Sequence, residues 1–174
     1  TTVAETHRAT IALVCSIVKA AQRRPRRRSS QRNDASAAGA GPTPKLYFLD
    51  TGLCAYLTDW LTPENLEAGA MSGAFFETWC FIELFKSYRH SGRRAPFFYY
   101  RDFDQVEIDL IIEADSVLYS VEFKKSANPG VNAARHFNKL EKLGKPSGKG
   151  AVICMVADAM PLTRKCILVP ASGL

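Results

Sequence analysis

The sequence predicts an α/β domain in which a mixed central sheet is flanked by helices. Apolar residues recur at helical spacing over 74–88, and three later runs rich in β-branched and aromatic residues are typical of strands separated by short polar turns. At 174 residues the chain is long enough for one domain with a sizeable core and too short for two ordinary ones.

The predicted elements follow one another from residue 45 onward. Asp50 can cap a short helix that runs to about Thr58, and a polar connection over 62–65 follows it. The remaining elements are a helix near 74–88, strands near 97–101, 106–113 and 117–124, an amphipathic helix near 132–143, and strands near 151–156 and 166–169.

The positive charge of the chain lies in its first 44 residues. The net charge is +6; residues 1–44 hold eight Lys and Arg against two Asp and Glu, whereas residues 45–174 hold fifteen of each. A helix can form over 6–24, but the arginine run that follows it and the Ser/Ala/Gly-rich stretch to residue 44 cannot build a core.

We therefore expect a basic, low-complexity segment over 1–43 and a folded domain over 44–174. The first residue is Thr1 instead of methionine, so we also expect the N-terminal segment to be truncated. Either residues 22–44 are a disordered linker, or their arginine run contacts the phosphates of a nucleic acid.

The five cysteines follow no metal-binding or disulfide pattern. They include no CxxC pair and have no close histidine partner, so we expect small apolar residues in a reducing compartment, the cytoplasm. The longest N-terminal apolar stretch, 9–21, contains Ser16 and Lys19 and falls short of the roughly 20 residues of a membrane helix. Residues 144–150 have the composition but not the spacing of a phosphate-binding loop, so the chain has no ATPase motif.

Ionisable residues interrupt two strands that otherwise have the composition of a core. Asp109 and Glu122 are both flanked by large apolar side chains. A buried charge is costly unless it is paired, hydrogen-bonded or bound to a metal. Because side chains alternate along a strand, Glu107 shares a face with Asp109, and Lys124 shares a face with Glu122. A hairpin turn at 114–116 would bring the two pairs together.

The helix over 74–88 contributes a third unusual carboxylate. Glu77 lies on the apolar stripe with Cys80 and Leu84, which should face the sheet. Glu83, in contrast, is placed to form a solvent-facing pair with Lys86. Glu77 is therefore either part of a site or a glutamate at the edge of the core that pairs with an arginine.

Two interpretations of these residues are open. The carboxylates can form a hard-cation site, beside which Lys124 lowers the pKa of a bound water or orients it. Alternatively, Asp109 and Lys124 form a structural ion pair that satisfies both charges. We expect Glu107 at the rim of the site. Arg101 can contact a phosphate or close a salt bridge to Glu107 or Asp102. Lys125 points to the opposite face of its strand, and we expect it in solvent.

Five segments of the chain resemble the domain-of-unknown-function 4143 family. They cover about residues 44–170 and occur in the family's order. The family domain usually follows an AAA-type ATPase domain in bacterial and archaeal proteins, and it is similar to the restriction-endonuclease-like folds of the PD-(D/E)xK group, whose core order is αβββαβ. The segments are PKLYFLDTGL (44–53), GAFFE (73–77), YYRD (99–102), EID (107–109) and EFKKS (122–126).

The resemblance implies a magnesium or manganese site for phosphodiester cleavage. Carried over from the nuclease group, Glu77, Asp109 and Glu122 would be metal ligands, and Lys124 would activate or position water. The implied partners are DNA or RNA and an ATPase module. Where members of the family have that module, this chain has the basic segment. The alternative is a non-catalytic interaction or accessory module of an ATP-binding protein, which the neutral charge of residues 45–174 favours.

Overall fold

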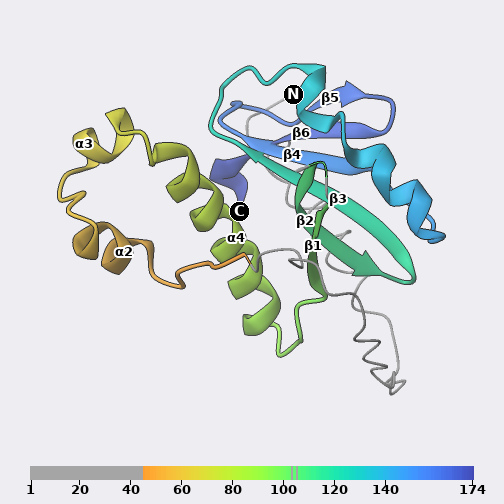
Figure 1. Ribbon diagram of the computed structural model, residues 1–174, viewed down its shortest axis with the longest axis horizontal. Helices are drawn as coiled ribbons and strands as arrows, with labels where there is room; N and C mark the ends of the chain where they lie inside the picture. The colour runs from red at the N-terminus through yellow and green to blue at the C-terminus, as the bar shows by residue number, and fades with distance from the viewer. Residues whose placement is uncertain (1–44, 103, 105) are drawn as a thin grey trace.

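A six-stranded mixed sheet forms the centre of the molecule, in the strand order β1-β2-β3-β4-β6-β5 (Figure 1). The computed structural model describes residues 45–102, 104 and 106–174. β3, β4 and β6 run parallel, whereas β1, β2 and β5 each pair antiparallel with a neighbour, which confirms the prediction of a mixed α/β domain. The strands are β1 (Phe97–Arg101), β2 (Glu107–Ala114), β3 (Val117–Lys124), β4 (Gly150–Cys154), β5 (Met160–Thr163) and β6 (Cys166–Pro170).

Helical elements cover the sheet and extend beyond it. The α-helices are α2 (Thr51–Leu57), α3 (Pro63–Ala68) and α4 (Ser72–His90), and the 3₁₀ segments are η1 (Val131–Ala134), η2 (Phe137–Leu143) and η3 (Ala171–Gly173). The basic segment expected over 1–43, with its helix and its arginine run, lies outside the described residues. No helix in the described part of the chain combines the length and the apolar character that a membrane span requires.

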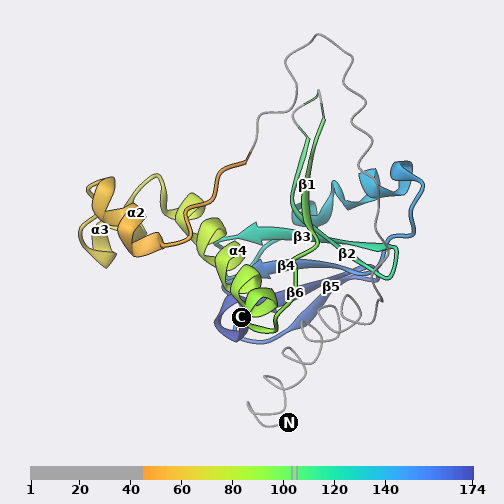
Figure 2. The ribbon, with the colours of Figure 1, turned by 90° about the horizontal axis from the view of Figure 1, so that it is seen from below.

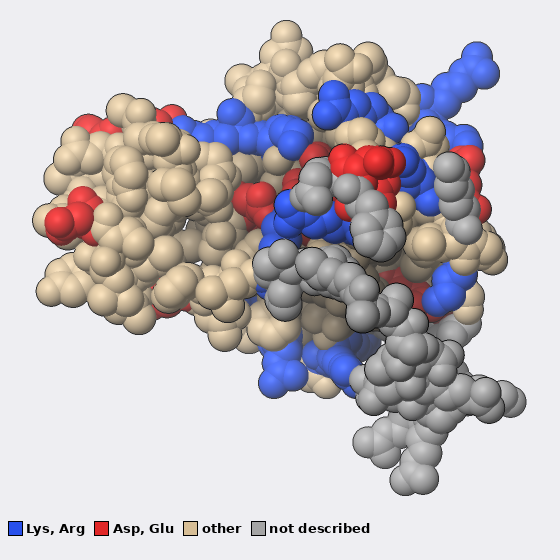
Figure 3. Space-filling model, viewed as in Figure 1, with Lys and Arg blue, Asp and Glu red and all other residues tan. Residues whose placement is uncertain are grey.

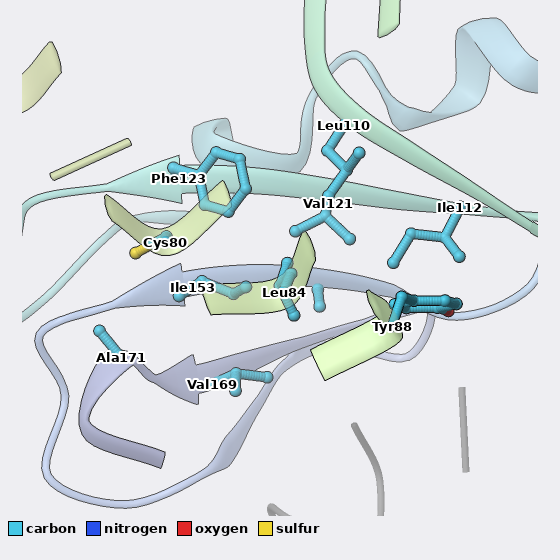
Figure 4. Close-up of a cluster of buried hydrophobic side chains, with 11 residues drawn as sticks. Cys80, Leu84, Tyr88, Leu110, Ile112, Val121, Phe123, Ile153, Val169 and Ala171 are labelled. Carbon is cyan, nitrogen blue, oxygen red and sulfur yellow. The ribbon is translucent and has the colours of Figure 1, made fainter. Parts of the chain in front are cut away.

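The apolar stripe of α4 packs on one face of the sheet, as its spacing predicts. Cys80, Leu84 and Tyr88 are buried against side chains of β2, β3, β4 and β6 (Figure 4). The opposite face is covered by η1 and η2, which pack on the buried residues of β4 and β6 through Ala133, Ala134 and Phe137. The inner strands β2, β3, β4 and β6 are therefore buried on both faces, as expected where parallel strands form the centre of a sheet.

The β2–β3 hairpin closes through a two-residue turn. Ala114 pairs with Val117, and the intervening Asp115 and Ser116 have φ angles of 50° and 65°. Two consecutive residues with positive φ match the right-handed twist of the flanking strands, and short polar residues tolerate this conformation. The predicted hairpin at 114–116 is thus confirmed, and it fixes the register that continues to the pair Leu110 and Val121.

β2 contains a bulge at Asp109 and Leu110, on the side where it pairs with β1. Phe98 pairs with Ile111, but Tyr100 pairs with Ile108, so two residues of β2, Asp109 and Leu110, stand opposite Tyr99 alone. In a regular strand Ile108 and Leu110 would share a face. Here Leu110 packs under α4, whereas Ile108 packs with residues of β3 and η2 on the other face. The bulge therefore changes which side chains of β2 face α4.

Three details of the predicted fold are wrong. The expected helix over 132–143 is two 3₁₀ segments, because Ala134, Phe137 and Leu140, which contact the core, are spaced by three residues, the 3₁₀ repeat. The expected connection over 62–65 begins α3, which Thr62 caps by accepting a hydrogen bond from the Asn65 amide (3.3 Å). β5 was not predicted, since it is a short edge strand that contains Pro161.

α2 and α3 form a helical lobe, residues 50–71, that extends away from the sheet (Figures 1 and 2). Asp50 caps α2 as predicted, since its carboxylate accepts a hydrogen bond from the Leu53 amide (2.9 Å). Neither helix contains a buried residue, in contrast to α4. The free energy of folding should therefore depend on α4 and the sheet much more than on this lobe.

Leu84→Ala should lower the free energy of unfolding by about 2–5 kcal/mol, because it leaves a cavity between α4 and the sheet. The matched control is Leu57→Ala on α2, where the leucine is exposed, and the change should stay within about 0.5 kcal/mol. Urea denaturation followed by circular dichroism measures both values. Equal losses for the two variants would contradict the packing described above.

Candidate functional site

The ammonium group of Lys45 lies among three carboxylates. Its Nζ is 2.6 Å from Glu77 Oε1, 2.6 Å from Glu107 Oε1 and 3.0 Å from Asp109 Oδ1. Glu77 comes from α4, the other two carboxylates come from β2, and Lys45 comes from the extended segment before α2. We call these four side chains the Lys45 cluster. It joins three parts of the chain that are distant in sequence.

The bulge in β2 explains why two carboxylates of that strand meet α4. Because Asp109 and Leu110 together oppose one residue of β1, Glu107 and Asp109 both lie on the side that Leu110 buries under α4. The shared face of Glu107 and Asp109 that alternation predicts is confirmed by their common contact with Lys45. Without the extra residue, the two carboxylates would project to the opposite face of the sheet.

A backbone hydrogen bond holds Asp109 in place. The register between β2 and β3 runs to the pair Leu110 and Val121. At the next position the Asp109 carboxylate accepts a hydrogen bond from the Phe123 amide (Phe123 N to Asp109 Oδ2, 3.0 Å). One carboxylate oxygen thus takes the place of a strand carbonyl, and the other contacts Lys45. Asp109 is 8% exposed, and a charge in such a position requires partners of this kind.

Tyr47 attaches the Lys45 segment to α4. Its ring stacks on that of Phe81, with centroids 3.9 Å apart and an interplanar angle of 8°. Its hydroxyl donates to Glu77 Oε1 at 3.1 Å. Burial raises the pKa of Tyr47, so the hydroxyl keeps the proton that it donates. Although burial alone would lower the pKa of Lys45, the charge of Asp109 and the hydrogen bonds that Lys45 donates to Glu107 and Glu77 raise it, and Lys45 therefore remains a cation.

Glu122 and Lys124 form a second pair beside the Lys45 cluster. Lys124 Nζ donates to Glu122 Oε1 at 2.8 Å. Burial raises the pKa of Glu122 to about 7, and the charge of Asp109 on the neighbouring strand adds to this effect, although Lys124 opposes it. Burial alone would lower the pKa of Lys124, but its hydrogen bond to Glu122 and the charges of the nearby carboxylates together raise it. Glu122 is therefore a carboxyl group that can bind and release a proton near neutral pH.

The structure brings most of the predicted site residues together, with different pairings. Asp109 pairs with Lys45, and Lys124 pairs with Glu122, so the Asp109–Lys124 ion pair of the alternative interpretation is replaced by two others. The partner of Glu77 is Lys45, where an arginine was the alternative expectation. The remaining expectations concern residues at the edge of the site.

Glu107, expected at the rim, has the most exposed side chain of the three carboxylates, yet it lies as close to the ammonium as Glu77 does. Arg101 pairs with Glu107 in the β1–β2 ladder, which places it at this edge. The predicted solvent-facing pair of Glu83 and Lys86 is confirmed, with 2.8 Å between Oε1 and Nζ.

Two lysines were misjudged or missed from the sequence. Lys125 was expected in solvent, but its Nζ lies 2.6 Å from Glu67 Oε1 and donates to the Ser72 hydroxyl, which ties α3 to the end of β3. Lys45 was not considered as a site residue. The signal that could have found it is the alternation of Lys45 and Tyr47 with apolar residues in an extended segment, which puts both on one face.

The donor chemistry of the site fits a hard divalent cation. Carboxylate oxygens are the ligands that Mg²⁺ and Mn²⁺ prefer, and oxygens of Glu77, Glu107 and Asp109 already surround one positive charge. In the arrangement seen over the described ranges, no group of three or more Asp, Glu, His or Cys residues is set to hold a metal ion. The position that these oxygens share is taken by the Lys45 ammonium group.

The site lies between α4 and the sheet of an α/β domain, and its carboxylates come from α4 and β2. A family profile described as a domain of unknown function (DUF4143) matches residues 72–174, more than half of the chain, and the protein therefore belongs to this family. The match begins at α4, so Lys45 and the helical lobe lie before it. No curated protein and no solved structure matches the chain.

The raised pKa of Glu122 should make stability depend on pH. Between its ordinary pKa of 4.5 and the value of about 7, the folded protein holds a proton that the unfolded chain has lost. The free energy of unfolding should therefore fall as the pH rises through this range. Glu122→Gln should remove this slope and exceed the wild type by about 1–2 kcal/mol at pH 8, with a smaller difference at pH 5.

Urea denaturation at pH 5, 6, 7 and 8 in a buffer without divalent metal measures this dependence. Glu83→Gln, on the exposed side of α4, is the control and should leave the wild-type slope unchanged. A wild-type slope that survives in Glu122→Gln would show that another group carries it.

Proposed function

We propose that this domain is a divalent-metal-dependent nuclease-like domain that cleaves phosphodiester bonds of DNA or RNA. The observation that carries the proposal is the convergence of carboxylates from α4 and β2 on one cation position, next to a Glu-x-Lys pair on β3. The order α4, β1, β2, β3, 3₁₀ segments and β4 is consistent with the αβββαβ order of restriction-endonuclease-like folds.

Glu77, Asp109 and Glu122 would hold Mg²⁺ or Mn²⁺, with Glu107 at the edge of the same position. When bound, the metal would polarise a phosphate oxygen and lower the pKa of a water molecule. Asp109 connects the Lys45 cluster with the Glu122–Lys124 pair. It contacts Lys45, as Glu77 does, and it stands on β2, the strand next to β3, which carries Glu122. Its bond from the Phe123 amide orients it before any ligand arrives.

Glu122 and Lys124 supply the proton chemistry of the proposed reaction. A carboxyl group whose pKa lies near 7 is suited to accept a proton from the attacking water. Lys124 is bound to that carboxylate and its side chain is 44% exposed, so the ammonium group can reach a phosphate at the surface while it stays charged. In this role it stabilises the negative charge that develops on the phosphate.

A second function, that of a non-catalytic accessory module for an AAA-type ATPase, is favoured by the helical lobe. α2 and α3 contain no buried residue, and the sequence from 46 to 85 has no Lys or Arg. In Figure 3 the face of the lobe that is seen consists mainly of uncharged residues with scattered acidic ones, and its exposed large apolar side chains include Leu53, Tyr56 and Leu57. A pocket of about 340 Å³ lies between the lobe and α4, lined by apolar side chains such as Phe75 and Trp79. A surface of this type suits contact with another protein.

The full chain should cleave labelled single- or double-stranded DNA or RNA in the presence of Mg²⁺ or Mn²⁺. Asp109→Asn and Lys124→Ala should each reduce the rate by about 100-fold or more, because each removes a group that acts in the transition state. Glu83→Gln is the matched control and should retain the wild-type rate. Metal binding without cleavage of any of the four substrates would favour the accessory module.

A further inference from the structure

We propose that Lys45 is a built-in competitor of the divalent cation, so that metal enters the site only when the segment 45–49 withdraws from it. This inference rests on the proposed metal site and adds a mode of regulation to it. Lys45 is the member of the cluster that an extended segment carries, whereas the three carboxylates stand on α4 and β2.

The ammonium group and a metal ion cannot occupy the site together. Lys45 Nζ lies within 3.0 Å of an oxygen from each of three carboxylates. Two of these oxygens, from Glu77 and Asp109, belong to proposed metal ligands, and a Mg²⁺ ion that bound both at about 2.1 Å would lie close to the ammonium nitrogen. Two cations at such a separation repel each other strongly in a partly buried site. A divalent cation that binds here, whether Mg²⁺ or Mn²⁺, must therefore displace the Lys45 ammonium group.

Within the part of the chain that the structure describes, few contacts besides those of Lys45 hold the segment in place. Tyr47 supplies the stack on Phe81 and the hydrogen bond to Glu77, and its ring lies beneath Lys45 Nζ, 5.7 Å from the centroid. The neighbouring Leu46 and Leu49 are mostly exposed, at 83% and 65%, so they add little burial. Segments with so few buried contacts open at low free-energy cost. The first structural element after the segment is α2, which begins beyond the Asp50 cap.

The carboxylates keep their positions when the segment leaves. Glu77 stands in the second turn of α4, and Asp109 stays hydrogen-bonded to the Phe123 amide. Without Lys45 these groups repel one another, and a divalent ion would relieve that repulsion more strongly than a single ammonium group does. The lysine therefore neutralises the site in the absence of metal and sets a threshold of metal concentration for its activation.

Titration calorimetry of the full chain with Mn²⁺ tests the proposal without reference to activity. Lys45→Met keeps the length of the side chain and removes its charge. It should bind Mn²⁺ tighter than the wild type by about tenfold or more, because no charge-assisted contacts need to be broken. Tyr47→Ala, which loosens the segment but keeps the lysine, should also bind tighter, by a smaller factor. Lys86→Met is the control lysine, paired with Glu83 on the outer side of α4, and should match the wild type.

Hydrogen exchange gives a second readout on the wild-type chain. Addition of Mn²⁺ should speed the exchange of the amides at 46–49, because the segment leaves when the metal binds, while the amides of β3 should not change. In the absence of metal, Lys45→Met should melt below the wild type, and saturating Mn²⁺ should raise its Tm by more than it raises that of the wild type. Circular dichroism establishes that each variant is folded.

The outcomes separate this inference from the proposed function. Equal Mn²⁺ affinity of the wild type and Lys45→Met, or weaker binding by the variant, would overturn the competition and leave the metal site intact. Failure of the folded wild type and of both folded variants to bind Mn²⁺ or Mg²⁺ would overturn the metal site itself, and the inference with it. Tighter binding by Lys45→Met and by Tyr47→Ala, with faster exchange at 46–49, would support both.

Discussion

Three carboxylates from two elements can share one small space in this protein because a cation lies among them. Without it, Glu77, Glu107 and Asp109 would repel one another at the edge of an apolar core. The Lys45 ammonium group supplies that charge, and through it an extended segment, a helix and a strand are joined. The attachment of the segment before α2 and the charge balance among the three carboxylates both depend on this interaction.

The sheet provides the other constraint, since it decides where the charges can stand. The bulge in β2 moves Glu107 and Asp109 to the side of α4, and the tight turn at Asp115 and Ser116 fixes the register that brings β3 beside them. Asp109 then serves as a backbone acceptor for β3. Its charge also acts on Glu122 and, together with burial, raises the pKa of that carboxyl group to a value at which it can exchange a proton.

The molecule divides into a rigid part and a loosely attached part. α4 and both faces of the sheet enclose the apolar core, whereas the segment 45–49 and the helical lobe bury little surface. The carboxylates belong to the rigid part and the lysine to the loose part. The two proposed functions use different surfaces, the acidic site in one case and the helical lobe in the other.

The sequence by itself determined the elements whose pattern is local: the stripe of α4, the three strands from Phe97 to Lys124, the hairpin turn and the cap at Asp50. It also singled out Glu77, Asp109, Glu122 and Lys124 as unusual, since charges in apolar strands and stripes are conspicuous. Only the tertiary structure decided the pairings. Lys45 lies 62 and 64 residues from Glu107 and Asp109, and the bulge follows from the pairing of β2 with β1. Periodicity reports which face a residue occupies within its own element, and it carries no information on which distant charge will meet that face.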